Sequence, residues 1–134
     1  MRYDIPATSH EVHRALSSLT GDFADHGLGT ETSGTLQLVL AEALNNIVEH
    51  SGCAPEDCIT LTLDFQSHAV QCALRDAGMP PPDGLHSTDA EFAAVEELPE
   101  GGFGLQIIFG LVTDLTYRRC GAYNILSFSL PHQT

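Results

Sequence analysis

Lysine is absent from this chain of 134 residues, and the formal net charge at neutral pH is −13. The only strongly basic side chains are five arginines: Arg2, Arg14, Arg75, Arg118 and Arg119. Phosphate backbones and anionic lipids would repel such a chain, which argues against direct binding to nucleic acid or to membranes. If the chain binds a phosphate-bearing ligand, a metal ion and backbone N–H groups must meet most of the ligand's charge.

Long apolar runs are also missing. No segment approaches the run of about 20 apolar residues that spans a bilayer, and the N-terminus has no apolar signal-peptide segment. The apolar fraction of 43% is nevertheless ordinary for a globular protein. We therefore expect a single cytoplasmic domain covering residues 1–134.

The four cysteines, Cys53, Cys58, Cys72 and Cys120, show no C-x-x-C spacing. Zinc-binding and thioredoxin-type functions thus find no support, and buried structural thiols are the better interpretation. Seven histidines are many for this length. His10 and His13 can share a helix face, but a lone pair at this spacing is more often a surface feature than a metal site.

Hydrophobic periodicity predicts a strand, two helices, two strands, a long irregular segment, a helix and two strands. A capping box at Thr8–Glu11 begins the first helix. The remaining ranges are a strand at 2–7, a first helix ending near 27–29, a second helix at 32–51, strands at 59–65 and 70–74, an irregular segment at 77–102 with a short helix at 89–96, a buried helix at 105–112, and strands at 114–118 and 123–130.

Because helices and hairpins occur in groups, this order predicts an α+β fold. We expect a two-layer sandwich in which a mixed, mostly antiparallel sheet carries the helices on one face. The irregular segment is longer than most loops in compact domains, and such loops often serve as lids or binding segments.

A polar row borders the apolar stripe of the second helix. Glu42, Asn46 and His50 are spaced by four residues, whereas Asn45 and Glu49 point away from the stripe. At the rim of a cleft, the Asn46 side-chain oxygen can ligate Mg²⁺, and Glu42 can orient a nucleophile or accept its proton. Taken alone, the row is more simply interpreted as a solvated helix flank.

The second polar feature ends the strand that follows. Asp76 shares the phase of Cys72 and Leu74, so it points to the face that those residues bury. A buried carboxylate needs a hydrogen-bond donor, which an adenine amino group would supply, and Gly78 would let the base approach the backbone. The alternative is that Asp76 caps a turn, but that alternative does not explain its phase.

The third feature is the glycine-rich segment Glu100–Leu105, which opens the predicted buried helix. Glycines let backbone N–H groups converge, and a helix N-terminus carries partial positive charge, so the two together can hold phosphate. No G-K-[S/T] follows and no strand precedes the segment, which excludes a Walker loop and a dinucleotide fingerprint.

The order of these three features resembles the GHKL (histidine kinase-like, Bergerat) ATPase superfamily. Within it, the segment Leu40–His50 looks like the first nucleotide box of the anti-sigma-factor serine/threonine kinases. The similarity extends through 101–108 and 114–117 to 123–126, and so covers nearly the whole chain.

The resemblance implies a role for each matching residue. Glu42 would be the catalytic glutamate, Asn46 the Mg²⁺ ligand and Asp76 the reader of adenine. Gly78 would lie beneath the base, and Gly102, Gly104 and Leu105 would hold the phosphates. Members of this family bind ATP with Mg²⁺ and phosphorylate a serine or threonine of an antagonist protein of the anti-anti-sigma (STAS) type. They typically also bind a sigma factor, often as homodimers.

The chain departs from the family pattern in its irregular segment. Phe103 stands where many relatives carry an arginine between the glycines. Within the irregular segment 77–102 there is no lysine or arginine, and there are six acidic residues: Asp83, Asp89, Glu91, Glu96, Glu97 and Glu100. This leaves two functions open, a kinase that regulates by partner switching and a nucleotide-binding module that sequesters its partner without efficient phosphate transfer. The catalytic module of a sensor histidine kinase is disfavoured, because the first predicted helix is too short to form a phosphoacceptor helix pair.

Overall fold

The computed structural model describes residues 1–50, 53–54, 56–78, 92–94 and 110–132. Two helices and six strands lie in this part of the chain. They are β1 (Arg2–Pro6), α1 (Ser9–Asp25), α2 (Thr30–His50), β2 (Cys58–Phe65), β3 (Ala69–Asp76), β4 (Phe92–Ala94), β5 (Thr113–Cys120) and β6 (Tyr123–Pro131).

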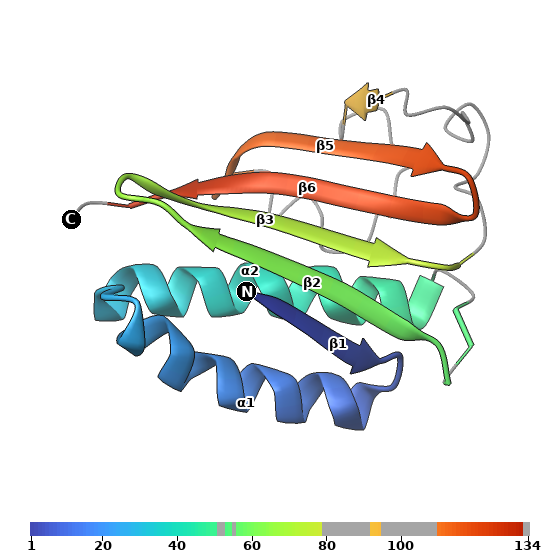
Figure 1. The fold of residues 1–134 in the computed structure, drawn as a ribbon, viewed down its shortest axis with the longest axis horizontal. Helices are drawn as coiled ribbons and strands as arrows, with labels where there is room; N and C mark the ends of the chain where they lie inside the picture. Colours follow the sequence, from blue (N-terminus) through green and yellow to red (C-terminus); the bar gives the residue numbers. More distant parts are fainter. Residues whose placement is uncertain (51–52, 55, 79–91, 95–109, 133–134) are drawn as a thin grey trace.

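The strands form one sheet in the order β1-β2-β3-β6-β5-β4, and every pair of described neighbouring strands is antiparallel. Both helices lie against the same face of this sheet (Figure 1). The predicted α+β sandwich with a mostly antiparallel sheet is therefore confirmed. No helix in the described ranges is long and apolar enough to cross a membrane.

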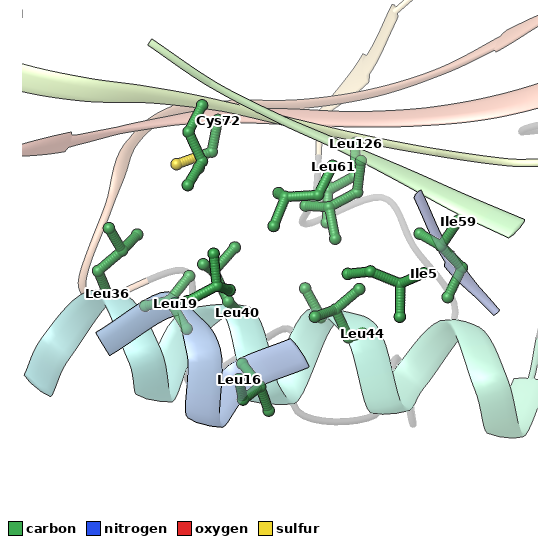
Figure 2. Packing of buried hydrophobic residues seen from close by; sticks show 14 of the residues in the cluster. Ile5, Leu16, Leu19, Leu36, Leu40, Leu44, Ile59, Leu61, Cys72 and Leu126 are labelled. Atoms are coloured by element: carbon green, nitrogen blue, oxygen red, sulfur yellow. The ribbon is translucent and has the colours of Figure 1, made fainter. Parts of the chain in front are cut away.

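The core lies between the two layers. Leu36, Leu40 and Leu44 point from α2 toward the sheet, where Leu61 and Leu126 meet them (Figure 2). The strict alternation in β2 produces this layer, because Ile59, Leu61 and Leu63 share one face and are fully buried. The apolar stripe predicted for the second helix is thus the contact surface of α2.

Local signals set the ends of α1. The Thr8 hydroxyl accepts a hydrogen bond from the Glu11 backbone N–H over 3.2 Å, which is the Thr side of the predicted capping box. At the other end Gly27 has φ +80, a conformation that glycine adopts without strain. Between these ends, the helical spacing of Val12, Leu16, Leu19 and Phe23 places all four on one side, which is buried in the core.

Two local predictions need correction. The short helix expected at 89–96 is wrong, because Phe92–Ala94 is a strand that pairs with Thr116–Arg118 of β5. The open hydrogen-bonding edge of β5 overrides the weak local preference for helix. Of the buried helix expected at 105–112, residues 105–109 lie outside the described part, while Gly110 and Leu111 form an exposed turn.

The cysteines are also less uniform than predicted. Cys72 is buried in the core, and this burial raises the pKa of its thiol to about 12. Cys58 and Cys120 are exposed, and Cys53 is half-buried, so the expectation of four buried thiols holds fully only for Cys72.

Candidate functional site

Asp76 is buried at the end of β3, on the face of the sheet that carries the helices. Only 5% of its surface is exposed, and it shares that face with Cys72 and Leu74, as its phase predicted. Its Oδ1 accepts one hydrogen bond from the Gly78 backbone N–H over 2.8 Å and another from Asn124 Nδ2 over 3.1 Å. The carboxylate is therefore held in place from both its own turn and a neighbouring strand.

Strand register brings a second and a third polar residue to Asp76. Asp76 pairs with Asn124 of β6, and Asn124 pairs with Arg119 of β5, so the three residues form one row across three strands. Arg119 Nη1 donates to Asn124 Oδ1 over 3.0 Å and to the Gly78 carbonyl over 2.9 Å. Arg119 Nε donates to the carbonyl of Gly121 over 3.1 Å.

Sequence reasoning did not assign roles to Arg119 and Asn124. One signal could have found Asn124, because it shares the phase of Leu126 and Phe128, two buried residues of β6. A buried amide at the end of a strand requires a polar partner in the same way as Asp76 does. The identity of that partner depends on the register between β3 and β6, which no local pattern reveals.

The surroundings of Asp76 act on its pKa in opposite directions. Burial raises the pKa of the carboxyl, whereas the hydrogen bonds from Gly78 and Asn124 and the positive charge of Arg119 lower it; the net direction is upward. Tyr117 is half-buried on β5, and its pKa is raised by burial and by the negative charge of Asp76. The Asp76 end of the sheet is thus a buried polar site with Tyr117 as an aromatic neighbour.

The predicted polar row lies along the border of the buried stripe of α2. Glu42 and Asn46 are half-buried, whereas Asn45 and Glu49 are exposed. The Asn46 Oδ1 atom is itself buried, and none of the described residues donates a hydrogen bond to it. A buried oxygen without a donor is costly, and a cation or an ordered water would satisfy it. The side chain of His50 lies outside what the structure describes.

The polar row on α2 and Asp76 at the end of β3 lie at the same end of the molecule. The C-terminal ends of α2 and β3 both reach the edge where β6 begins (Figure 1). Cys53, which follows α2, is hydrogen-bonded to the backbone of Ala77, which follows Asp76. The chain after α2 is thus in contact with the turn after β3. Gly102, Gly104 and Leu105, the third predicted component, lie outside the described residues.

The chain matches the family of histidine kinase-like ATPase domains over residues 5–130. This match covers almost the whole sequence, and the chain therefore belongs to that family. Membership indicates that the domain binds ATP, and it agrees with the α+β architecture described above. No match was found among curated proteins.

Proposed function

We propose that the chain is a single ATP-binding domain, in which Asp76 and Gly78 bind adenine and Gly102, Gly104 and Leu105 bind the phosphates. The observation that carries this proposal is the buried Asp76 carboxylate, whose Oδ1 is occupied while no described residue donates to Oδ2. A carboxylate oxygen that belongs to a buried residue and receives no donor from the described residues suits the exocyclic amino group of adenine.

Asn46 is the residue that would hold Mg²⁺. Its buried Oδ1 lacks a donor among the described residues, and side-chain carbonyl oxygens are ligands that Mg²⁺ accepts. When bound, the ion would neutralise phosphate charge, which matters in a chain of net charge −13 without lysine. The donor-free Oδ1 of Asn46 therefore supports its proposed role as the metal ligand.

Glu42 is the proposed catalytic residue. It lies one turn before Asn46 on the same side of α2 and is half-buried, so both side chains can face the same ligand. Its carboxylate would orient an attacking hydroxyl and accept its proton, while binding and positioning supply most of the catalysis, as is general for phosphoryl transfer.

The reaction that fits these roles is phosphorylation of a protein serine or threonine. We propose that the acceptor is an antagonist protein of the anti-anti-sigma type in a partner-switching system, with a sigma factor as a further partner and a homodimer as the working form. The support is the resemblance of the segment Leu40–His50 to the first box of the anti-sigma-factor kinases.

A second function is favoured by one observation, the six acidic residues and the absent lysine and arginine between 79 and 100. Negative charge near the phosphates would weaken ATP binding and slow phosphate transfer. The domain would then capture its partner with nucleotide as a structural ligand. Incubation of labelled ATP with candidate antagonist proteins separates the two functions, because only the kinase transfers label.

The pocket itself is tested without any partner. Mg·ATP at about one hundred times its Kd should stabilise the wild-type protein by about 2.7 kcal/mol, measured as a rise in melting temperature. Asp76→Ala should abolish this rise, whereas Asp64→Ala, which removes an exposed carboxylate from β2, should keep it. Absence of any rise in the wild type would contradict ATP binding.

A further inference from the structure

The Asn124 amide can be oriented in only one way. Arg119 donates to its Oδ1 over 3.0 Å, and a guanidinium has donors but no acceptor. The oxygen of the amide must therefore face Arg119, and its NH₂ group must face Asp76 Oδ1, 3.1 Å away. Arg119 is itself anchored, because its Nε donates to the carbonyl of Gly121 in the turn between β5 and β6.

This arrangement distinguishes the two oxygens of Asp76. Oδ1 receives donors from Asn124 and from the Gly78 backbone, whereas no described residue donates to Oδ2. Arg119 also holds the Gly78 carbonyl over 2.9 Å, so the turn and the carboxylate are fixed by the same side chain. The result is one carboxylate oxygen with a defined direction and no donor from the described residues.

We propose that Arg119 and Asn124 are positioning residues that reserve Asp76 Oδ2 as an acceptor and so make the site select 6-aminopurine over 6-oxopurine nucleotides. This proposal rests on the proposed function, in which Asp76 contacts the base. A 6-amino group donates to a carboxylate, whereas the 6-oxo group of inosine presents an acceptor and is repelled. Selection therefore requires that Asp76 stay ionised and correctly oriented.

The same two residues oppose protonation of Asp76. Burial raises the pKa of the carboxyl, and Arg119 and Asn124 work against that rise. Among the described residues, Tyr117 on β5 and Cys53 after α2 are further ionisable groups that interact with Asp76, and burial favours the neutral form of both. Without the pair, Asp76 would more readily take up a proton and become a donor, which a 6-oxo group accepts.

The test compares the binding of ATP and inosine triphosphate by calorimetry, in the presence of Mg²⁺, for the wild type, Arg119→Gln and Asn124→Ala. The wild type should prefer ATP by roughly tenfold or more, the size expected for a hydrogen bond to a charged group. In both variants the ratio of the two Kd values should fall by roughly tenfold, toward one. Arg75→Gln is the matched control and should keep the wild-type ratio, because Arg75 precedes Asp76 on the opposite face of the sheet and lies over the Tyr123 ring.

The ratio of the two Kd values separates positioning from a merely structural role. Loss of a merely structural residue would weaken the binding of both nucleotides by the same factor, so the ratio would not change. If Arg119→Gln or Asn124→Ala fails to fold by circular dichroism, Arg119→Lys and Asn124→Thr replace them. Lysine keeps the positive charge and should retain part of the preference. An unchanged ratio in folded variants overturns the proposal while leaving ATP binding intact. A wild type that binds neither nucleotide overturns the proposed function instead.

Discussion

Asn124 Nδ2 donates a hydrogen bond to Asp76 Oδ1 over 3.1 Å, although the two residues are 48 positions apart in the chain. They meet because β3 and β6 are antiparallel neighbours whose register pairs these positions. Both are among the few buried polar residues in the described part of the protein. The geometry of the Asp76 carboxylate is therefore a product of strand pairing as well as of its own turn.

Asn46 and its neighbour Asn45 form a matched pair for testing the metal ligand. Mg²⁺ should strengthen ATP binding less in Asn46→Ala than in the wild type, because the buried Oδ1 is lost. The factor by which saturating Mg²⁺ lowers the Kd for ATP should fall by at least roughly tenfold. Asn45→Ala removes an exposed amide from the same turn and should leave Mg²⁺ titrations unchanged. Equal effects of the two variants would count against Asn46 as the ligand.

Glu42 should affect phosphate transfer far more than nucleotide binding. Glu42→Gln keeps the size of the side chain but removes its ability to accept a proton, and the rate should fall by about 10²–10⁴-fold with the Kd for ATP nearly unchanged. The control is Glu49→Gln, at an exposed position further along α2. Single-turnover measurements with labelled ATP give the rate, and a Glu42→Gln protein that transfers phosphate at the wild-type rate would remove Glu42 from the mechanism.

The buried carboxyl of Asp76 should make the stability of the protein depend on pH. Its pKa in the folded state is raised above the ordinary value of 3.8, so the folded state binds more protons than the unfolded state just above that value. The contribution of Asp76 to the free energy of unfolding is thus fully present below the unfolded pKa and is lost as pH rises through the folded pKa.

Asp76→Asn cannot titrate and keeps an oxygen for the two donors. Its stability relative to wild type should therefore increase from about pH 3.5 upward and level off above the folded pKa of Asp76. Urea unfolding of both proteins across this range measures the difference, with Asp64→Asn as the exposed comparison. A difference that is constant with pH, or that shrinks as pH rises, would contradict the upward direction of the pKa.

Two leucines of α2 test the packing that holds the site. Leu40 is fully buried under the sheet, and Leu40→Ala should lower the free energy of unfolding by about 2–5 kcal/mol. Leu38 is 46% exposed, and Leu38→Ala should change it by only about 0.5 kcal/mol. Denaturant titrations give both values, and similar losses for the two variants would be inconsistent with the orientation of α2.

The periodic elements could be predicted because their apolar residues repeat at helical or strand spacing. The stripe Leu36–Ile47 predicted α2 and its buried side, and the alternation from Ile59 to Phe65 predicted β2. The same logic placed Asp76 on the buried face, because a strand reverses its side chains at every residue. Such patterns depend only on neighbours in the chain.

The segment 89–96 shows where that reasoning fails. Its local sequence favours a short helix, yet Phe92–Ala94 becomes a strand once β5 offers an edge with unpaired backbone groups. The choice is made by a partner more than 20 residues away in sequence, as the pairing of Phe92 with Arg118 shows. Short segments with weak preferences are the ones most easily overridden by such pairing.

The sequence alone determined the class of fold and the buried sides of α2, β2 and β3, because each of these depends on local spacing and side-chain chemistry. Only the tertiary structure decided that Arg119 and Asn124 hold Asp76 and Gly78, and that Asn46 Oδ1 is buried without a donor among the described residues. These relationships depend on strand order and register, which arise when distant segments pack to bury a common core.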